Sequence, residues 1–309
     1  MIRVVVKRLL VGVLVMWGAA SLIFVIVRVA PGDPATLMLG PDAPPEQVRE
    51  LTARLGLDQP LPLQYLNYLG DVVRLEFGDS YLFNRPAMAE VLERMPATAE
   101  LMLVSTAIAV IAGLVLGLIA GGRPGGAVDR VVSAGTIALQ SFPTFWTGIM
   151  LILLFALALR LLPSAGAGTP AHLVLPAVTL ALPFTATVAR LTRTSVAETM
   201  HEQYIQTARS KGLTERQVLL GHALRNSLIP VVTIVGLHMG GLMGGAVVVE
   251  NVFAWPGVGT LVVESVANRD YTVVQAATFL VAGIVMAFNL AADLVYSQLD
   301  PRIRLDGAS

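Results

Sequence analysis

Long apolar runs dominate the hydropathy pattern of the chain. A bilayer core about 30 Å thick requires about 20 apolar residues in a helix. Five runs meet this length: 9–29, 99–120, 131–159, 229–249 and 276–295. A sixth run, near 173–189, is shorter and contains Pro176 and Pro183, but neighbouring helices satisfy the backbone groups that proline frees inside membrane proteins. The pattern predicts an all-α membrane protein with six transmembrane helices.

Lysine and arginine residues orient these helices. If the N-terminus lies in the cytoplasm, the short external loops contain only Arg160 and Arg269, and all remaining basic residues outside 28–98 are cytoplasmic. The cytoplasmic set is Arg3, Lys7, Arg8, Arg123, Arg130, Arg190, Arg193, Arg209, Lys211, Arg216, Arg225, Arg302 and Arg304. Because cytoplasmic loops carry the excess of positive charge, we expect both termini in the cytoplasm. The apolar run 9–27 is too long for a signal-peptide core, and Arg28-Val29-Ala30-Pro31 is a poor cleavage site, so we expect a retained first span.

The composition agrees with a membrane protein. Hydrophobic residues make up 55% of the chain, charged residues make up 14%, and the mean hydropathy is +0.72, values outside the range of soluble globular proteins. The formal net charge is zero, so no basic excess indicates nucleic-acid binding. The absence of cysteine excludes disulfides, thiolate catalysis and thiolate metal sites.

The spans divide the chain into segments. We expect a first transmembrane helix (1–29), an external cap (30–98), a core with five further transmembrane helices (99–295) and a cytoplasmic tail (296–309). The core contains a cytoplasmic loop at 190–228 and an external re-entry at 250–275. Helix signals in the cap predict one helix at about 45–56, opened by Pro45 and closed by Gly56, and another near 62–75.

The loop at 190–228 is a polar island between apolar runs. Residues 195–210 lack glycine and proline and contain good helix formers. Gly212 follows where a left-handed C-terminal cap is expected, so this helix should end there.

A second helix is expected directly after the glycine. Thr214 has Gln217 three positions later, which is the spacing of a capping box, and Leu213 and Val218 have the spacing of a hydrophobic staple. The second helix should therefore start at Glu215. A helix–turn–helix of this kind serves either as a rigid lever that docks a partner or as an amphipathic connector on the lipid surface.

The same residues resemble a known family. The run from Tyr204 to Leu213 and the run from His222 to Pro230 are similar to the coupling-loop signature of ABC importer permeases of the dipeptide, oligopeptide and nickel branch, whose members depend on a binding protein. The likeness covers nearly the whole chain. Its other motifs are Ala30-Pro31-Gly32-Asp33-Pro34, residues 55–62, Phe77-Gly78-Asp79-Ser80, residues 96–101, residues 249–259, Arg269-Asp270-Tyr271 and Leu299-Asp300-Pro301-Arg302.

This resemblance implies a type I ABC importer permease fold in a bacterial inner membrane. It implies a complex with a second homologous permease, two ABC ATPase subunits and an external solute-binding protein. It also assigns roles to three groups of residues. The ATPase-coupling group is Tyr204, Ile205, Ala208, Arg209, Lys211, Gly212 and Leu213; the pathway group is His238, Gly241, Met243 and Gly245; and the group for the external gate or binding-protein contact is Glu250, Phe253, Trp255, Pro256 and Gly257.

One departure from the wider superfamily concerns the coupling motif. That motif has Glu-Ala-Ala before its glycine and Leu-Pro after it, whereas this chain has Gln206-Thr207-Ala208 before Gly212 and Leu224-Arg225 in the later place. A salt bridge from an acid at position 206 is therefore not available. No glycine-rich loop ending in Lys-Ser/Thr exists in the chain, so we expect partner subunits to bind ATP and Mg²⁺ and this chain to carry no cofactor.

Several polar and small residues have two readings. Gly113, Gly117 and Gly121 favour close helix packing, and the glycines of the fifth span either pack in the same way or also widen a conduit. His238 either touches solute or a metal or is a packed, hydrogen-bonded histidine. Asn289 and Asp293 either mark an ion path or form a structural hydrogen bond between helices.

The competing classes of function lack their usual residues. A proton-driven secondary transporter usually has acids near the midplane and an inverted repeat, and neither is evident. An enzyme requires a nucleophile with a base or a metal cluster, and the four histidines, 172, 201, 222 and 238, are scattered. We expect a permease that carries di- or oligopeptides, with nickel chelates, glutathione, haem or oligosaccharides as alternative solutes.

Overall fold

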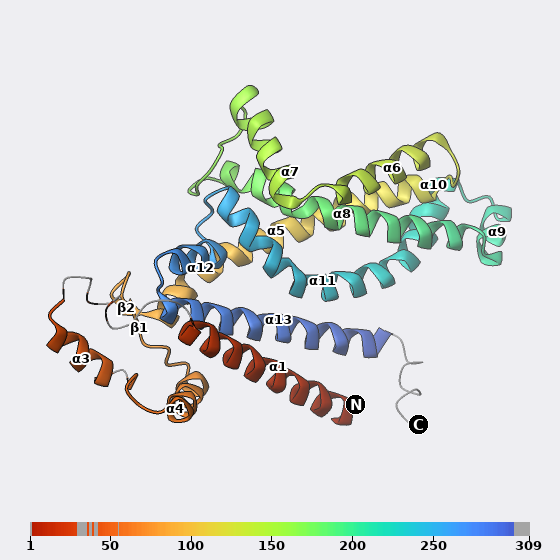
Figure 1. The fold of residues 1–309 in the computed structure, drawn as a ribbon. Coiled ribbons are helices and arrows are strands. Elements are labelled where there is room, and N and C mark those ends of the chain that lie inside the picture. The colour runs from red at the N-terminus through yellow and green to blue at the C-terminus, as the bar shows by residue number, and fades with distance from the viewer. Residues whose placement is uncertain (1, 30–35, 37–38, 40–42, 55, 300–309) are drawn as a thin grey trace. The chain divides into compact units, whose positions relative to one another are not determined.

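A computed structural model describes residues 2–29, 36, 39, 43–54 and 56–299. This part of the chain is helical apart from one antiparallel hairpin of two short strands, β1 (Asp79–Ser80) and β2 (Arg85–Pro86) (Figure 1). The helices are α1 (Ile2–Val29), α3 (Pro45–Arg54), α4 (Leu61–Arg74), α5 (Ala87–Gly121), α6 (Ala127–Ser141), α7 (Thr144–Leu151), α8 (Pro170–Met200), α9 (Gln203–Ser210), α10 (Glu215–Val218), α11 (Leu224–Val252), α12 (Val258–Ala267) and α13 (Tyr271–Leu299). Two π-helical segments, Ile152–Ala158 and Leu219–Ala223, continue α7 and α10. The motifs at 30–34 and 300–302 lie outside the described residues.

The expected spans correspond to long apolar helices. Five helices are long and apolar enough to cross a membrane, in α1, α5, α8, α11 and α13. A sixth span results if α6 and the helix Thr144–Ala158 are counted together. The all-helical fold with five or six spans is therefore confirmed in the described part of the chain.

The run at 131–159, expected as one span, is broken in the middle. The chain bends by 104° between α6 and the helix Thr144–Ala158. Phe142, at the break, has an extended backbone with φ −97° and ψ 136°. The next residue is Pro143, and a proline disfavours the helical conformation in the residue before it. The bend therefore follows from a local steric constraint that the hydropathy pattern does not register.

The short run at 173–189 lies within a helix of 31 residues, α8, which continues through Pro176 and Pro183. In its most apolar window 56% of the residues are buried, against 28% or fewer in the other four spans. This burial explains how α8 tolerates two prolines, because packed neighbours replace the backbone partners that proline removes. The low hydropathy of α8 has the same origin, since a span shielded from lipid does not need a wholly apolar surface.

The entry into α11 also differs from expectation. The fifth span was expected at 229–249, but α11 begins at Leu224 and continues directly from the π-helical segment 219–223, with Pro230 inside it. The cytoplasmic loop and the span are thus joined by continuous helix.

Backbone contacts divide the chain into two compact units, residues 1–96 with 260–286, and residues 97–259 with 287–309. In the first unit α4 packs on the end of α1 through aromatic side chains, with ring centroids of Phe24 and Tyr65 5.3 Å apart. The helices expected at 45–56 and 62–75 are present as α3 and α4. Buried Asp270 accepts hydrogen bonds from the hydroxyls of Ser80 and Thr272 and so fixes the hairpin to the start of α13.

In the second unit a stripe of glycines allows α5 to approach α8 closely. A Cβ atom added at Gly113 would lie 2.6 Å from Val188 Cβ, and one at Gly117 would lie 2.5 Å from Thr192 Cβ. One added at Gly121 would lie 2.7 Å from the carbonyl oxygen of Arg193. The packing interpretation of this stripe is therefore the one that the structure supports.

This contact yields a prediction about stability. Replacement of Gly117 by alanine is expected to destabilise the protein by about 1–3 kcal/mol, because the added methyl group overpacks the contact with α8. The matched control is Gly135→Ala on α6, where no atom lies within 4 Å of the added Cβ and alanine should gain up to about 1 kcal/mol of helix propensity. Thermal unfolding in detergent measures both variants, and equal midpoints would contradict the overpacking argument.

Candidate functional site

The expected coupling loop forms a compact helix–turn–helix. The residues 195–210 were expected as one helix, but α8 ends at Met200 and α9 begins at Gln203, with Glu202 in an extended conformation between them. No glycine or proline marks this break in the sequence. Packing decides it, because residues on both sides of the break contribute to one buried cluster, and tertiary packing overrides helix propensity.

The turn after α9 has the expected geometry. Gly212 has φ +85°, a conformation that glycine adopts without steric cost. The N–H of Leu213 donates to the carbonyl of Ala208 at 3.3 Å, and the N–H of Gly212 donates to that of Arg209 at 2.9 Å. These two bonds form a Schellman motif, which satisfies the last carbonyls of α9.

The next helix is capped as the sequence predicts. The N–H of Gln217 donates to Thr214 Oγ1 at 3.4 Å, and the N–H of Thr214 donates to Gln217 Oε1 at 2.9 Å. Together these bonds form the expected capping box. The turn at 211–214 is thus fixed by local bonds on both of its sides.

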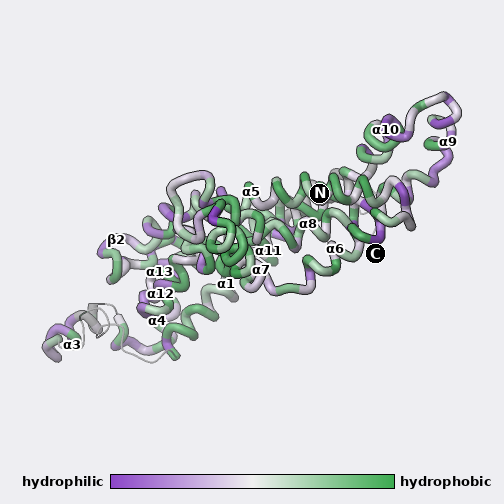
Figure 2. The backbone as a smooth tube through the Cα atoms, turned by 90° about the horizontal axis from the view of Figure 1, so that it is seen from above, coloured by the Kyte–Doolittle hydropathy of each residue, from purple (hydrophilic) through white to green (hydrophobic). Residues whose placement is uncertain are grey.

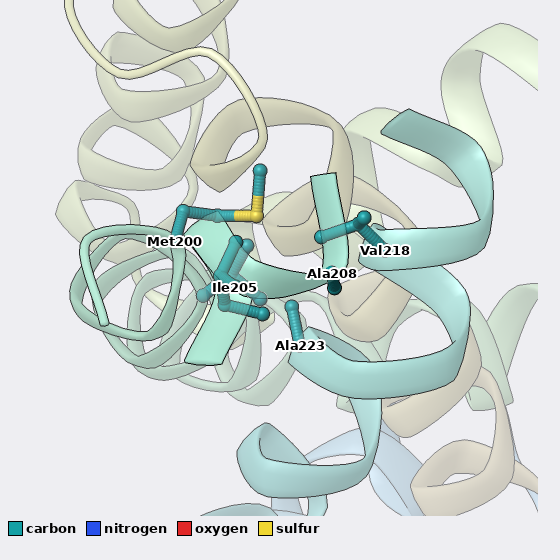
Figure 3. Packing of buried hydrophobic residues seen from close by; sticks show 6 residues of the cluster. Met200, Ile205, Ala208, Val218 and Ala223 are labelled. Atoms are coloured by element: carbon teal, nitrogen blue, oxygen red, sulfur yellow. The ribbon is translucent and has the colours of Figure 1, made fainter. Parts of the chain in front are cut away.

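A hydrophobic cluster holds the two helices together beneath this turn (Figure 3). Its buried members are Val196, Met200, Ile205, Ala208, Val218 and Ala223, and Leu118, Leu213 and Leu219 pack against them. Ile205 and Ala208, expected as coupling residues, therefore point into the core of the loop. The same cluster contains residues of α8 and is packed against by a residue of α5, so the loop is joined to the spans by buried apolar surface.

The outer face of the loop is polar. Figure 2 shows the apolar colouring of the long helices giving way to polar residues around α9. Tyr204, Arg209, Lys211 and Gly212 are exposed. Arg209 makes a two-pronged ion pair with Glu215, at 2.8 and 3.1 Å. This guanidinium holds the pKa of the Glu215 carboxyl below its usual value, so the pair is charged at neutral pH.

Two anchoring residues were missed from the sequence. Asp129, 4% exposed, accepts two hydrogen bonds from Arg193, at 2.9 and 2.7 Å, and one from the N–H of Gly125 at 2.8 Å. The pair joins the start of α6 to α8 seven residues before α8 ends at Met200. In the sequence Asp129 is visible only as an acid near the start of a helix, after Gly125 and Gly126. This pattern does not show that its partner is Arg193.

A second network surrounds the expected external gate. Glu250 is fully buried and accepts hydrogen bonds from the Thr98 hydroxyl and from the N–H of Gly259, both at 2.7 Å. Thr98 Oγ1 accepts in turn from the N–H of Val258 at 2.8 Å. One carboxylate thus ties α5, the end of α11 and the start of α12 together.

The loop between α11 and α12 is a tight turn around this carboxylate. The N–H of Gly257 donates to the carbonyl of Trp255 at 2.8 Å, and the Trp255 indole donates to the carbonyl of Ala97 at 2.9 Å. A side chain at Gly257 would collide with the Glu250 carboxylate. The backbone carbonyl of Phe253 accepts a hydrogen bond from the N–H of Gly166 at 2.8 Å. Of the five expected gate residues only Pro256 is partly exposed, so the contact with a binding protein stays a prediction, and the other four build the turn.

The expected pathway residues do not share one face of α11. His238 is half-buried and stacks on Phe184 with ring centroids 3.8 Å apart. Met243 is buried, and a Cβ at Gly245 would lie 3.1 Å from Leu180, whereas Gly241 is exposed. The pathway role of these residues stays a prediction.

The roles of Asn289 and Asp293 stay predictions. Asn289 is exposed, and the side chain of Asp293 lies outside the described residues. Among the described residues no group of three or more His, Asp or Glu side chains could hold a metal ion.

Comparison with known proteins decides the family. Residues 113–305 match the model of the family described as binding-protein-dependent transport system inner membrane component, and residues 1–102 match its N-terminal model. The chain belongs to this family. As a permease subunit it is a multi-pass protein of the inner membrane, and ATP is bound and hydrolysed by a separate subunit.

Similar proteins narrow the branch. The permease is 40% identical over 304 residues to the glutathione transport system permease protein GsiC of Escherichia coli strain K12, covering 98% of this chain and 99% of that protein. It is 37% identical over 308 residues to the probable peptide ABC transporter permease protein y4tP of Sinorhizobium fredii, covering 97% and 98%. It is therefore an ABC importer permease of the peptide and glutathione type.

Solved structures support the fold alone. An inward-facing structure of the MetNI methionine ABC transporter matches with a TM-score of 0.54 at 20% identity, covering 69% of this permease and 97% of that chain. An amino acid ABC transporter crystallised with histidines matches with a TM-score of 0.50 at 17% identity, covering 67% and 92%. Both are ABC importer permeases by fold.

The buried carboxylate network yields a second prediction. Replacement of Thr98 by valine keeps the shape but leaves Glu250 Oε1 and the Val258 N–H without this partner, and each unmade buried bond costs about 1–3 kcal/mol. The control is Thr179→Val on α8, since Thr179 is equally buried but donates only to the carbonyl of Leu175 in its own helix. Thermal unfolding should show a clearly larger loss for Thr98→Val. A loss no greater than that of Thr179→Val would show that the network does not stabilise the turn.

Proposed function

We propose that this permease forms half of the translocation pathway of an ATP-driven importer for di- or oligopeptides. The proposal rests on the branch to which the chain belongs, in which the similar proteins are described for glutathione and for peptides. Glutathione is itself a modified tripeptide, so both descriptions share a short, charged peptide backbone. Glutathione is the second candidate solute, favoured by the relatives at 40% identity. Solute choice rests mainly with the external binding protein.

The coupling loop carries the mechanical part of the proposal. In it the exposed residues Tyr204, Arg209 and Lys211 dock in a partner ATPase, and the buried cluster around Ile205 passes the movement to α8. A lever transmits motion only if it does not deform, and the local bonds at 211–214 together with the buried cluster supply that stiffness. These hydrogen bonds and this cluster are the observation that supports the coupling role.

The proposed complex contains a second homologous permease, two ABC ATPase subunits and an external solute-binding protein. Binding of ATP closes the ATPase pair and brings the two coupling loops together, and the spans tilt so that the pathway opens outward. Hydrolysis and release reverse the movement. ATP shifts this equilibrium only by its differential affinity for the two states. Residues 190–228 lie in the cytoplasm in this arrangement and 30–98 lie outside.

Within the pathway, the solute contacts the exposed side of α11 around Gly241, and His238, Met243 and Gly245 lie in supporting positions. The turn at Glu250–Gly257 serves as part of the outer gate. Its buried hydrogen bonds keep the turn in one shape, so the gate moves as a unit with the ends of α5, α11 and α12.

A prediction tests the lever. Replacement of Gly212 by valine is expected to leave the permease in the membrane but reduce uptake of a labelled dipeptide at least tenfold, because a β-branched residue resists φ +85° at a cost of about 1–2 kcal/mol and the turn must change shape. The control is Gly221→Val in the same loop, where the backbone is helical and no atom lies within 4 Å of an added Cβ. Uptake at the level of this control would remove the lever from the proposal.

A separate prediction tests the assembly and the solute. Gentle extraction of the tagged chain from its native membrane should bring with it a second permease and an ATP-binding subunit. The binding protein made with them should bind dipeptides or glutathione in calorimetry. Extraction of the chain alone would contradict the importer assembly, whereas a binding protein that takes only nickel chelates, haem or oligosaccharides would overturn the peptide assignment and leave the assembly intact.

A further inference from the structure

One side of α4, in the first unit, carries an apolar stripe. Its members are Pro62, Leu66, Leu69 and Val73, which recur at intervals of four, three and four residues and so share one side of the helix. Leu66 is 63% exposed and Val73 is 83% exposed. An amphipathic helix buries such a stripe against another surface, so the stripe calls for a covering partner.

The other two sides of α4 have different surroundings. Tyr65 and Tyr68 pack on Phe24 of α1, with ring centroids 5.3 and 5.4 Å apart. Asn67 and Asp71 line a cavity of about 420 Å³ whose walls carry charged groups of both signs. The helix therefore has a packed side, a polar side and the apolar stripe, and each side belongs in a different environment.

The span in α1 provides a scale of depth for α4. Figure 1 shows α4 beside the end of α1 that lies farthest from the N-terminus. The span runs from Arg8 to Val29, and at 1.5 Å per residue it covers about 33 Å, close to the thickness of a bilayer core. The level of Val29 therefore marks the edge of the apolar layer on this side.

A hydrogen bond inside the span holds α4 near this edge. The Ser21 hydroxyl donates to the carbonyl of Trp17 at 2.8 Å, so Tyr65 is the donor in its 2.6 Å bond to Ser21. Ser21 precedes Val29 by eight residues, which places it about 12 Å inside the end of the span. A residue of α4 thus reaches well below the edge of the apolar layer.

Two further contacts place α4 in the interfacial layer. Phe24, on which both tyrosine rings pack, lies about 8 Å inside the same end of the span. The Arg28 guanidinium, in the last turn of α1, donates to Gln64 Oε1 at 2.8 Å, and a charged group at this position reaches the headgroups. Amphipathic helices that lie in an interface bury their apolar side about 5–10 Å below the headgroups. The contacts of α4 with α1 fall at this level.

We propose that α4 lies in the plane of the membrane interface and that its stripe contacts the acyl chains of the leaflet in which α1 ends. Lipid is favoured over a protein partner because the stripe has no hydrogen-bonding side chain, whereas protein interfaces in water have a polar rim. Side chains of α1 at the same level are also apolar and more than half exposed, namely Leu22, Val25 and Ile26.

The inference changes the picture of the cap. In the orientation proposed above this leaflet is the outer one, so part of the segment 30–98 is embedded in the membrane. The inference rests on the contacts between α1 and α4 and does not depend on the solute or on the coupling role.

The test is spin-label accessibility in lipid nanodiscs, on the importer extracted with its partner subunits. The chain has no cysteine, so Leu66→Cys and Val73→Cys each add one labelling site, and the unsubstituted chain gives the background from other subunits. Electron paramagnetic resonance measures collisions of the label with oxygen, which concentrates in lipid, and with a water-soluble chromium complex. Oxygen should exceed chromium at both positions, as at Leu22→Cys on α1, and chromium should exceed oxygen at Asn67→Cys on the cavity side.

Two results would overturn the proposal. Greater accessibility to chromium than to oxygen at positions 66 and 73 would place the stripe in water. Low accessibility to both reagents would show that a protein covers it.

A charged variant tests the same contact independently. With the label at Val73→Cys, Leu66→Asp should raise chromium accessibility, because a carboxylate among acyl chains is unfavourable and moves the helix toward water. The matched control is Asn67→Asp, which adds the same side chain one residue along, on the cavity side, and should leave accessibility unchanged. If Leu66→Asp does not fold, Leu66→Asn replaces it with the same expected direction. Equal accessibility in the variant and the control would contradict the lipid contact.

Discussion

The close approach of α5 to α8 is the contact on which the second unit depends. Gly117 lies where any side chain would collide with Thr192 and with the backbone of Ala189. Because no hydrophobic driving force operates between helices in lipid, such contact at short range is what associates them. Together with α6, α7 and α11, which also pack on α8, α5 shields this helix from lipid, so α8 can keep two prolines and a less apolar sequence inside a membrane.

α8 then carries the functional loop at its end. The Asp129–Arg193 pair attaches α8 to α6 by charge, and the cluster around Ile205 attaches it to the coupling loop by apolar packing. The two attachments resist different movements. The bidentate ion pair resists rotation of α8 against α6, and the apolar cluster resists separation of the coupling loop from α8. At the opposite end of the unit the Glu250 network joins α5, α11 and α12 in the same fashion. Both ends of the unit thus move with their helices.

Local features of the structure could be predicted from the sequence, and contacts between distant segments could not. Gly212 and the pair Thr214 and Gln217 act within a few residues of one another, so their pattern sufficed to place the turn. The break after Met200 and the burial of Glu250 depend on side chains tens of residues away. The bend at Phe142 could be predicted only in part. Pro143 is a local signal for it, but the continuous apolar run 131–159 indicated one unbroken span. Among the candidate site residues, the family motif named the residues that lie exposed on the coupling loop, Tyr204, Arg209, Lys211 and Gly212. No pattern in the sequence indicated that Asp129 pairs with Arg193.

The turn at 211–214 affects which residues of the coupling loop can be substituted during evolution. The bonds that fix it come from residues 207–217 and use backbone atoms, the side chains of Thr214 and Gln217 and the ion pair of Arg209 with Glu215. Its shape is therefore independent of the exposed side chains at 204 and 211. In the coupling role proposed above, substitutions at those two positions would change which ATPase is recognised and would leave the shape of the turn unaltered, so recognition of the partner and transmission of movement could evolve separately.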